Sequence, residues 1–93
     1  MPGNNGYSIE YLEDVVKNDI PALPKTIKAI IKRAIEERLT VDPMGFGKPL
    51  RYSLKGHRRL RVGDYRIVYR IYSAPPTVRV IGIKHRKDIY EDL

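Results

Sequence analysis

Arginine side chains gather in the second half of the chain, in two runs rich in Val, Ile and Tyr that flank a Gly63-Asp64 pair. These arginines are Arg58, Arg59, Arg61, Arg66 and Arg70, and Arg86 follows a third apolar run. A guanidinium group binds phosphate through several N–H donors, and a pair of them can hold a pentavalent phosphorane more tightly than the ground-state diester. The residue types therefore predict binding of a phosphodiester, or chemistry on it.

Proton transfer at a phosphodiester requires another kind of side chain, because the pKa of arginine exceeds about 12. The two histidines of the chain are His57 and His85, and imidazole titrates near neutral pH. Tyr90 follows Arg86 closely, so positive charge is expected to lower its pKa, or its ring stacks on a base. The alternatives are an ordinary surface position for each histidine and a purely anchoring role for Tyr90.

A β-hairpin is predicted to position these groups. The Gly63-Asp64 pair predicts a tight turn, and residues 58–62 and 65–72 predict its two strands. Because strand side chains alternate between faces, a core position for Leu60 and Val62 sends other side chains to the opposite face. That opposite face then carries His57, Arg59, Arg61, Arg66 and Arg70. For Arg66 and Arg70, an ordinary solvated face is the alternative interpretation.

The remaining periodicity predicts an α+β fold, with two N-terminal helices packed on one face of a small, mainly antiparallel sheet. The expected elements are a strand over residues 7–11, helices over residues 12–17 and 24–39, and a central strand over residues 78–84. The face of the sheet without helices is left for function.

The stretch from Val41 to Leu50 is predicted to be a loop because of its Pro and Gly content. Met44 and Phe46 are expected to pin this loop to the core. A further short strand is expected to begin within residues 51–54.

The length of 93 residues predicts one domain spanning residues 1–93, with residues 1–6 disordered. The chain has no cysteine, which excludes disulfides and thiol nucleophiles and agrees with a reducing cytoplasm. A secretory leader is not expected, because residues 1–6 show neither a basic region nor an apolar one, and a membrane span is not expected, because no apolar run approaches about 18 residues. We expect a soluble, cytoplasmic protein.

The net charge of +7 is unevenly distributed, with six Lys or Arg against seven Asp or Glu in residues 1–46 and twelve against four in residues 47–93. A basic surface confined to one sheet predicts a polyanionic partner, with nucleic acid first. The four acids of the second half form no carboxylate cluster for Mg²⁺, and two separate histidines do not make a Zn²⁺ site. We therefore expect neither a metal ion nor a small-molecule cofactor.

Two stretches, Leu60 to Ile71 and Val80 to Tyr90, strongly resemble the RelE family of the RelE/ParE toxin superfamily. The resemblance implies a microbial-RNase-type fold and the toxin of a type II toxin-antitoxin pair. It further implies ribosome-dependent, metal-independent cleavage of mRNA in the ribosomal A site, in which the 2′-OH attacks the adjacent phosphate.

The resemblance also implies roles for individual residues. The arginines of the family fall on Arg66 and Arg86, its paired lysines on His57 and Arg59, and its C-terminal tyrosine on Tyr90. Because both lysines are replaced, the general base is His57, Tyr90 or another group, and His85 is the first candidate for the general acid. The remaining basic residues, expected to bind RNA, are Arg58, Arg61, Arg70, Lys84 and Lys87.

The expected partners are a RelB-like antitoxin, the ribosome and mRNA, with operator DNA contacted only through the antitoxin. Two other functions are weighed against this one. A ParE-like, non-enzymatic inhibitor of DNA gyrase uses the same scaffold, and a stand-alone RNA-binding module would need only the basic face.

Overall fold

The computed structural model describes residues 6–51 and 54–88 and has a five-stranded sheet. The strands are β1 (Ser8–Tyr11), β2 (Lys48–Pro49), β3 (Arg58–Val62), β4 (Tyr65–Ser73) and β5 (Pro76–His85), in the order β1-β5-β4-β3-β2. β1 runs parallel to β5, whereas the other neighbouring strands are antiparallel. The sheet is therefore mainly antiparallel, as predicted.

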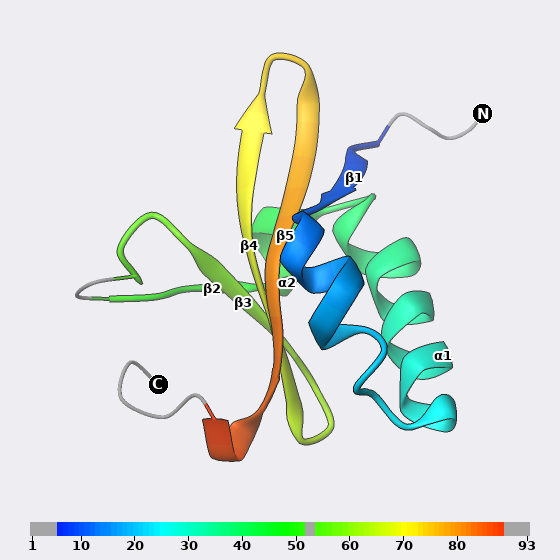
Figure 1. Ribbon diagram of the computed structural model, residues 1–93. Helices are drawn as coiled ribbons and strands as arrows, with labels where there is room; N and C mark the ends of the chain where they lie inside the picture. Colours follow the sequence, from blue (N-terminus) through cyan, green and yellow to red (C-terminus); the bar gives the residue numbers. More distant parts are fainter. Residues whose placement is uncertain (1–5, 52–53, 89–93) are drawn as a thin grey trace.

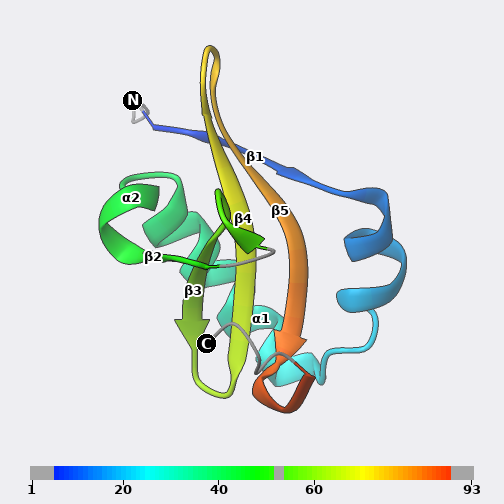
Figure 2. The ribbon, with the colours of Figure 1, turned by 90° about the vertical axis from the view of Figure 1, so that its left-hand side faces the viewer.

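The helices follow β1, and those before β2 lie on one side of the sheet, whereas the final turn after β5 lies toward the other side (Figure 1). They are the wide helical turn η2 (Val15–Asp19), helix α1 (Lys25–Ala34), its continuation η3 (Ile35–Leu39), the short helix α2 (Pro43–Phe46) and the final turn η5 (Arg86–Asp88). Viewed from the other side, β3, β4 and β5 lie in front and α1 lies behind them (Figure 2). One face of the central strands is thus free of helices. The predicted helix over residues 24–39 is confirmed by α1 and η3.

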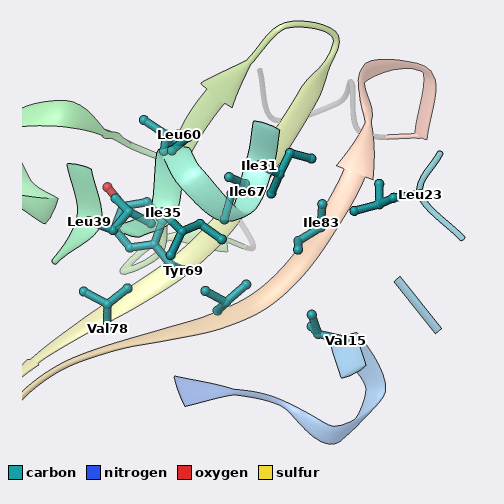
Figure 3. Close-up of a cluster of buried hydrophobic side chains, with 12 residues drawn as sticks. Val15, Leu23, Ile31, Ile35, Leu39, Leu60, Ile67, Tyr69, Val78 and Ile83 are labelled. Carbon is teal, nitrogen blue, oxygen red and sulfur yellow. The ribbon is translucent and has the colours of Figure 1, made fainter. Parts of the chain in front are cut away.

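The core lies between α1, η3 and the helix-bearing face of the sheet (Figure 3). Ile31, Ile35 and Leu39 from the helices meet Ile67 and Tyr69 from β4, and all five side chains are buried. Burial of this apolar surface supplies the main driving force for folding.

The hairpin is confirmed. Val62 pairs with Tyr65 across the turn, and Gly63 has a φ of 60°, a conformation that glycine adopts readily. Leu60 is buried, so the faces of β3 alternate as the sequence predicts.

Two other local predictions are wrong, and a third concerns residues that are mostly not described. Met44 and Phe46 are exposed and do not pin their segment to the core. Arg51 and Leu54 lie outside any strand, since the short strand of this region is β2, and residues 52–53 are not described. The predicted disorder of residues 1–6 also falls on residues that the structure leaves undescribed, except for Gly6.

Hydrogen bonds, in place of Met44 and Phe46, help to pin the segment between residues 41 and 50, in which Pro43 and Leu50 are buried. Arg58 Nη2 donates to the carbonyl oxygens of Met44, at 2.8 Å, and Gly47, at 3.0 Å. The hydroxyl of buried Tyr69 donates to the carbonyl oxygen of Pro43. These contacts, together with the buried ring of Pro43, fix α2 against the sheet although Met44 and Phe46 stay exposed.

Asp19, at the end of η2, completes the edge of β5 beyond the point where β1 stops. Its buried carboxylate accepts a hydrogen bond from the Ile83 amide at 2.9 Å and one from Lys84 Nζ at 3.0 Å. A buried amide without an acceptor is costly. Asp19 therefore stabilises the end of β5, which leads to Arg86.

Replacing Asp19 with alanine is expected to lower the free energy of unfolding by about 2 kcal/mol, because the Ile83 amide loses its acceptor. Asp19→Asn keeps a side-chain oxygen and should lose less. Urea unfolding of both variants measures the difference. Asp14→Ala is the matched control, because Asp14 flanks the same helical turn and is exposed; a loss equal to that of Asp19→Ala would contradict the assignment.

Candidate functional site: a cationic sheet face

The face of the sheet without helices carries a cluster of cations, here called the arginine face. Arg61 and Arg66 are cross-strand partners on β3 and β4, and Arg66 is in turn the partner of Lys84 on β5. Strand alternation places Arg59 and Arg70 on this same face. The structure therefore brings together four of the predicted arginines and one predicted lysine.

Arg66 is the central member of the arginine face and is only 9% exposed. Its Nε and Nη1 atoms are buried and have no hydrogen-bond partner among the described residues. Burial is the main cause that lowers the pKa of Arg66, and the charges of Arg61, Arg59 and Arg86 lower it further. A buried guanidinium that faces other cations is destabilising unless an anion joins it.

Arg86 reaches the arginine face from η5. Its backbone amide donates to the Asp64 carbonyl oxygen at 2.7 Å, which ties η5 to the hairpin turn. Its Nε lies 3.7 Å from Asp64 Oδ1, but both side chains are more than 60% exposed. Such an exposed pair contributes little free energy, so the Arg86 guanidinium is available to a ligand.

The two histidines do not meet on the arginine face. His85 packs edge-on against Tyr65, with ring centroids 5.1 Å apart, and its Nδ1 accepts from the Lys87 amide. Tyr65 packs against the hydrophobic core, so His85 lies on the helix-bearing face. His57 precedes β3, and its Nδ1 lies 3.2 Å from the Leu54 carbonyl oxygen. If Nδ1 carries the proton, Nε2 is the acceptor.

Arg58 also points away from the arginine face. It shares its side of β3 with buried Leu60, and its guanidinium binds the carbonyl oxygens of α2. Arg70 is exposed and lies 5.9 Å from the ring centroid of Tyr72. Tyr90 lies beyond the described residues, and Lys87 is exposed on η5.

Groups of acids and histidines suited to a metal ion are absent from residues 6–51 and 54–88. Within the same ranges, every helix is too short or too polar to cross a lipid bilayer.

A family model for the ParE toxin of the type II toxin-antitoxin system parDE matches residues 10–90. The curated toxin RelG of Mycobacterium tuberculosis is 38% identical over 74 residues, which cover 80% of this chain and 85% of RelG. This chain belongs to the RelE/ParE family of type II toxins. The resemblance found in the sequence is thereby confirmed.

Two further relatives of this toxin come from the same organism. The toxin RelE of Mycobacterium tuberculosis is 38% identical over 72 residues, which cover 77% of this chain and 74% of that toxin. A chain from the crystal structure of the RelBE2 toxin-antitoxin complex superposes with a TM-score of 0.81 at 32% identity, over 87% of this chain and 92% of that chain. The α+β architecture of the toxin is that of this family.

Sequence reasoning missed several residues near the toxin's arginine face. Asp19 pairs with Lys84, and Asp64 holds the backbone of Arg86. Arg38 and Lys48 gather at the outer edge of β3, beside Arg59 and Arg61. The Gly-Asp turn signal could have indicated Asp64, whereas the other positions depend on tertiary contacts between distant segments.

Proposed function

We propose that this toxin is an endoribonuclease that cleaves mRNA in the ribosomal A site. The observation that carries the proposal is the Arg66 guanidinium among other arginines, whose buried Nε and Nη1 have no hydrogen-bond partner in residues 6–51 and 54–88. An RNA phosphate supplies the missing acceptor, and a phosphorane, which carries more negative charge, gains more from the same donors. The arrangement thus favours the transition state over the ground state.

The proposed reaction needs no metal ion. The 2′-oxygen forms a bond to the adjacent phosphorus as its proton passes to a base, and the bond from phosphorus to the 5′-oxygen breaks as an acid protonates that oxygen. Arg66 contacts the phosphate, while Arg59, Arg61 and Arg86 complete its surroundings. His57 is the candidate base within the described residues, and Tyr90 is the candidate acid. His85 fits the acid role less well, because it packs against Tyr65 on the other face.

The proposed partners are the ribosome, mRNA and a RelB-like antitoxin, all in the cytoplasm. A chain of similar fold belongs to the RelBE2 toxin-antitoxin complex. An acidic or amphipathic antitoxin segment over the arginine face would neutralise its charge and exclude RNA. Contact with operator DNA would then occur only through the antitoxin.

The test is cleavage by purified toxin of mRNA bound to programmed ribosomes, followed by mapping of the new 5′ ends. We expect cuts in phase with codons, no cuts in naked mRNA and inhibition by antitoxin. Message that stays intact on the ribosome, together with inhibited DNA gyrase, would instead support the ParE-like function.

Arg86→Ala is expected to lower the cleavage rate by about tenfold, because an exposed charge is partly screened by solvent and salt. Single-turnover cleavage of ribosome-bound mRNA measures this rate. Arg33→Ala on α1 is the matched control, because Arg33 is also an exposed arginine but pairs with Glu37 in its own helix. If the two substitutions change the cleavage rate equally, Arg86 is not part of the functional site.

A further inference from the structure

A second cationic site borders the arginine face at the outer edge of β3, here called the edge hollow. Its volume is about 230 Å³, and it is lined by Arg38, Phe46, Lys48, Arg59, Leu60 and Arg61. Four of these six side chains are cations and none is an acid. Such a lining favours a polyanion. Figure 2 shows α2 and β2 beside β3 at this edge of the sheet.

Phe46 is the one aromatic residue among the described residues that line the edge hollow, and it is 51% exposed although hydrogen bonds hold the backbone around it. The Arg58 guanidinium binds the carbonyl oxygens of Met44 and Gly47, one on each side of Phe46 in the chain. Asp42 Oδ1 accepts from the Gly45 amide at 3.0 Å and caps the same short helix. Because the backbone is already fixed, only the two side-chain torsions of Phe46 lose conformational entropy when a flat group stacks on its ring.

The edge hollow is continuous with the arginine face. Arg59 and Arg61 line the hollow and also belong to the cationic surroundings of Arg66. A chain of phosphates can therefore pass from one site to the other without leaving cationic surroundings.

We propose that the edge hollow binds a second stretch of single-stranded RNA, with a base stacked on Phe46 and the flanking phosphates held by Arg38 and Lys48. This inference rests on the proposed ribonuclease function and extends its RNA-binding surface. Cationic grooves with aromatic rings are the usual means of binding single strands. The strand belongs either to the mRNA or to ribosomal RNA.

A peptide strand fits the same edge less well. β2 already pairs with Arg58 and Arg59, which leaves residues 60–62 as the free part of the β3 edge. Strand addition relies on a row of backbone hydrogen bonds, and three residues offer few of them.

The test uses a fluorescein-labelled hexamer of 2′-O-methyl uridine, which lacks the attacking 2′-OH and cannot be cleaved. We expect Phe46→Leu to weaken binding by about 5- to 150-fold in fluorescence anisotropy, the range for loss of one stacked base. Phe46→Tyr keeps an aromatic ring and is expected to bind like the native toxin. Thermal unfolding checks that both variants are folded.

The charges of the edge hollow are tested by the salt dependence of binding. The double variant Arg38→Gln, Lys48→Gln is expected to reduce the slope of log affinity against log salt by about 1.4, or 0.7 for each lost phosphate contact. The matched control Lys28→Gln, Lys32→Gln removes two exposed cations from α1 and should leave the slope unchanged. Equal slopes for both double variants, or native affinity for Phe46→Leu, would overturn the inference.

The source of the RNA is found by photo-cross-linking on programmed ribosomes, with p-benzoylphenylalanine in place of Phe46. Cross-links to mRNA or to ribosomal RNA support the proposal and identify the strand, whereas cross-links to protein alone overturn it. Failure of the edge hollow and failure of the proposed nuclease function give different results. If the toxin cuts mRNA in phase with codons but Phe46→Leu binds the hexamer with native affinity, only the edge hollow is refuted. If hexamer binding depends on Phe46 but ribosome-bound mRNA is not cut, only the nuclease function is refuted.

Discussion

Replacing Arg66 with methionine is expected to make the toxin more stable and to remove most of its activity. Methionine fills a similar volume without a charge, so the substitution removes a buried guanidinium whose Nε and Nη1 find no partner in the part of the chain that the structure describes. We expect the free energy of unfolding to rise by about 1–2 kcal/mol. The rate of mRNA cleavage on ribosomes should fall by about 10²- to 10³-fold, the usual loss when one transition-state donor is removed. Urea unfolding and single-turnover cleavage measure the two effects.

Arg70→Met is the matched control for stability, because it makes the same substitution on the same strand and face at an exposed position. We expect it to change the free energy of unfolding by less than about 0.5 kcal/mol. A destabilised Arg66→Met variant would show that Arg66 is a structural residue with its charge satisfied in the free toxin. A ligand-binding arginine is distinguished by a gain in stability together with a loss of activity on substitution, whereas substitution of a structural arginine lowers both.

The position of the arginine face could be predicted from sequence because it depends on simple geometry. The Gly63-Asp64 turn fixes the register of β3 against β4, and alternation then determines the face of each side chain. Buried Leu60 and Ile67 on one side require Arg61 and Arg66 on the other. A register shifted by one residue would have buried the arginines in the core.

The side of His85 could not be predicted because β5 contains an irregularity. Val68 pairs with Gly82 while Tyr69 pairs with Val80, so Ile81 is an extra residue in the ladder. Such a bulge reverses the alternation of the residues that follow it. Val78 and Val80 face the core before the bulge, and Ile83 faces it afterwards. His85 consequently joins Ile83 on the helix-bearing face, although it directly precedes Arg86 in sequence.

Arg58 and Phe46 lie in the opposite environments to those predicted from sequence. An arginine among strand residues suggests a surface position, and a phenylalanine in a loop suggests a core anchor. In the structure, Arg58 lies under α2 and binds its carbonyl oxygens, while Phe46 is half exposed. Carbonyl acceptors occur at every residue, so no sequence pattern reveals which of them a half-buried arginine such as Arg58 will bind.

The contact between α2 and the sheet predicts a second large effect, at Gly47. Its backbone is extended, with a φ of −101°, so glycine is required here for space and not for conformation. A Cβ atom at this position would overlap the Tyr69 hydroxyl and lie 2.9 Å from the Arg59 carbonyl oxygen. Gly47→Ala is expected to lower the free energy of unfolding by about 3 kcal/mol, because it separates α2 from the sheet and breaks the bond from Tyr69 to Pro43.

Gly82→Ala provides the matched control, since the nearest atoms to a Cβ there are 4.0 Å away. We expect it to change stability by less than about 0.5 kcal/mol in the same urea titration. Equal losses from the two substitutions would mean that the loss reflects glycine replacement in general and not the close approach of Tyr69. If only Gly47→Ala strongly lowers the free energy of unfolding, the strain is specific to this position. Adding Tyr69→Phe to Gly47→Ala removes the overlapping hydroxyl and should recover part of that loss, which would locate the strain at this contact.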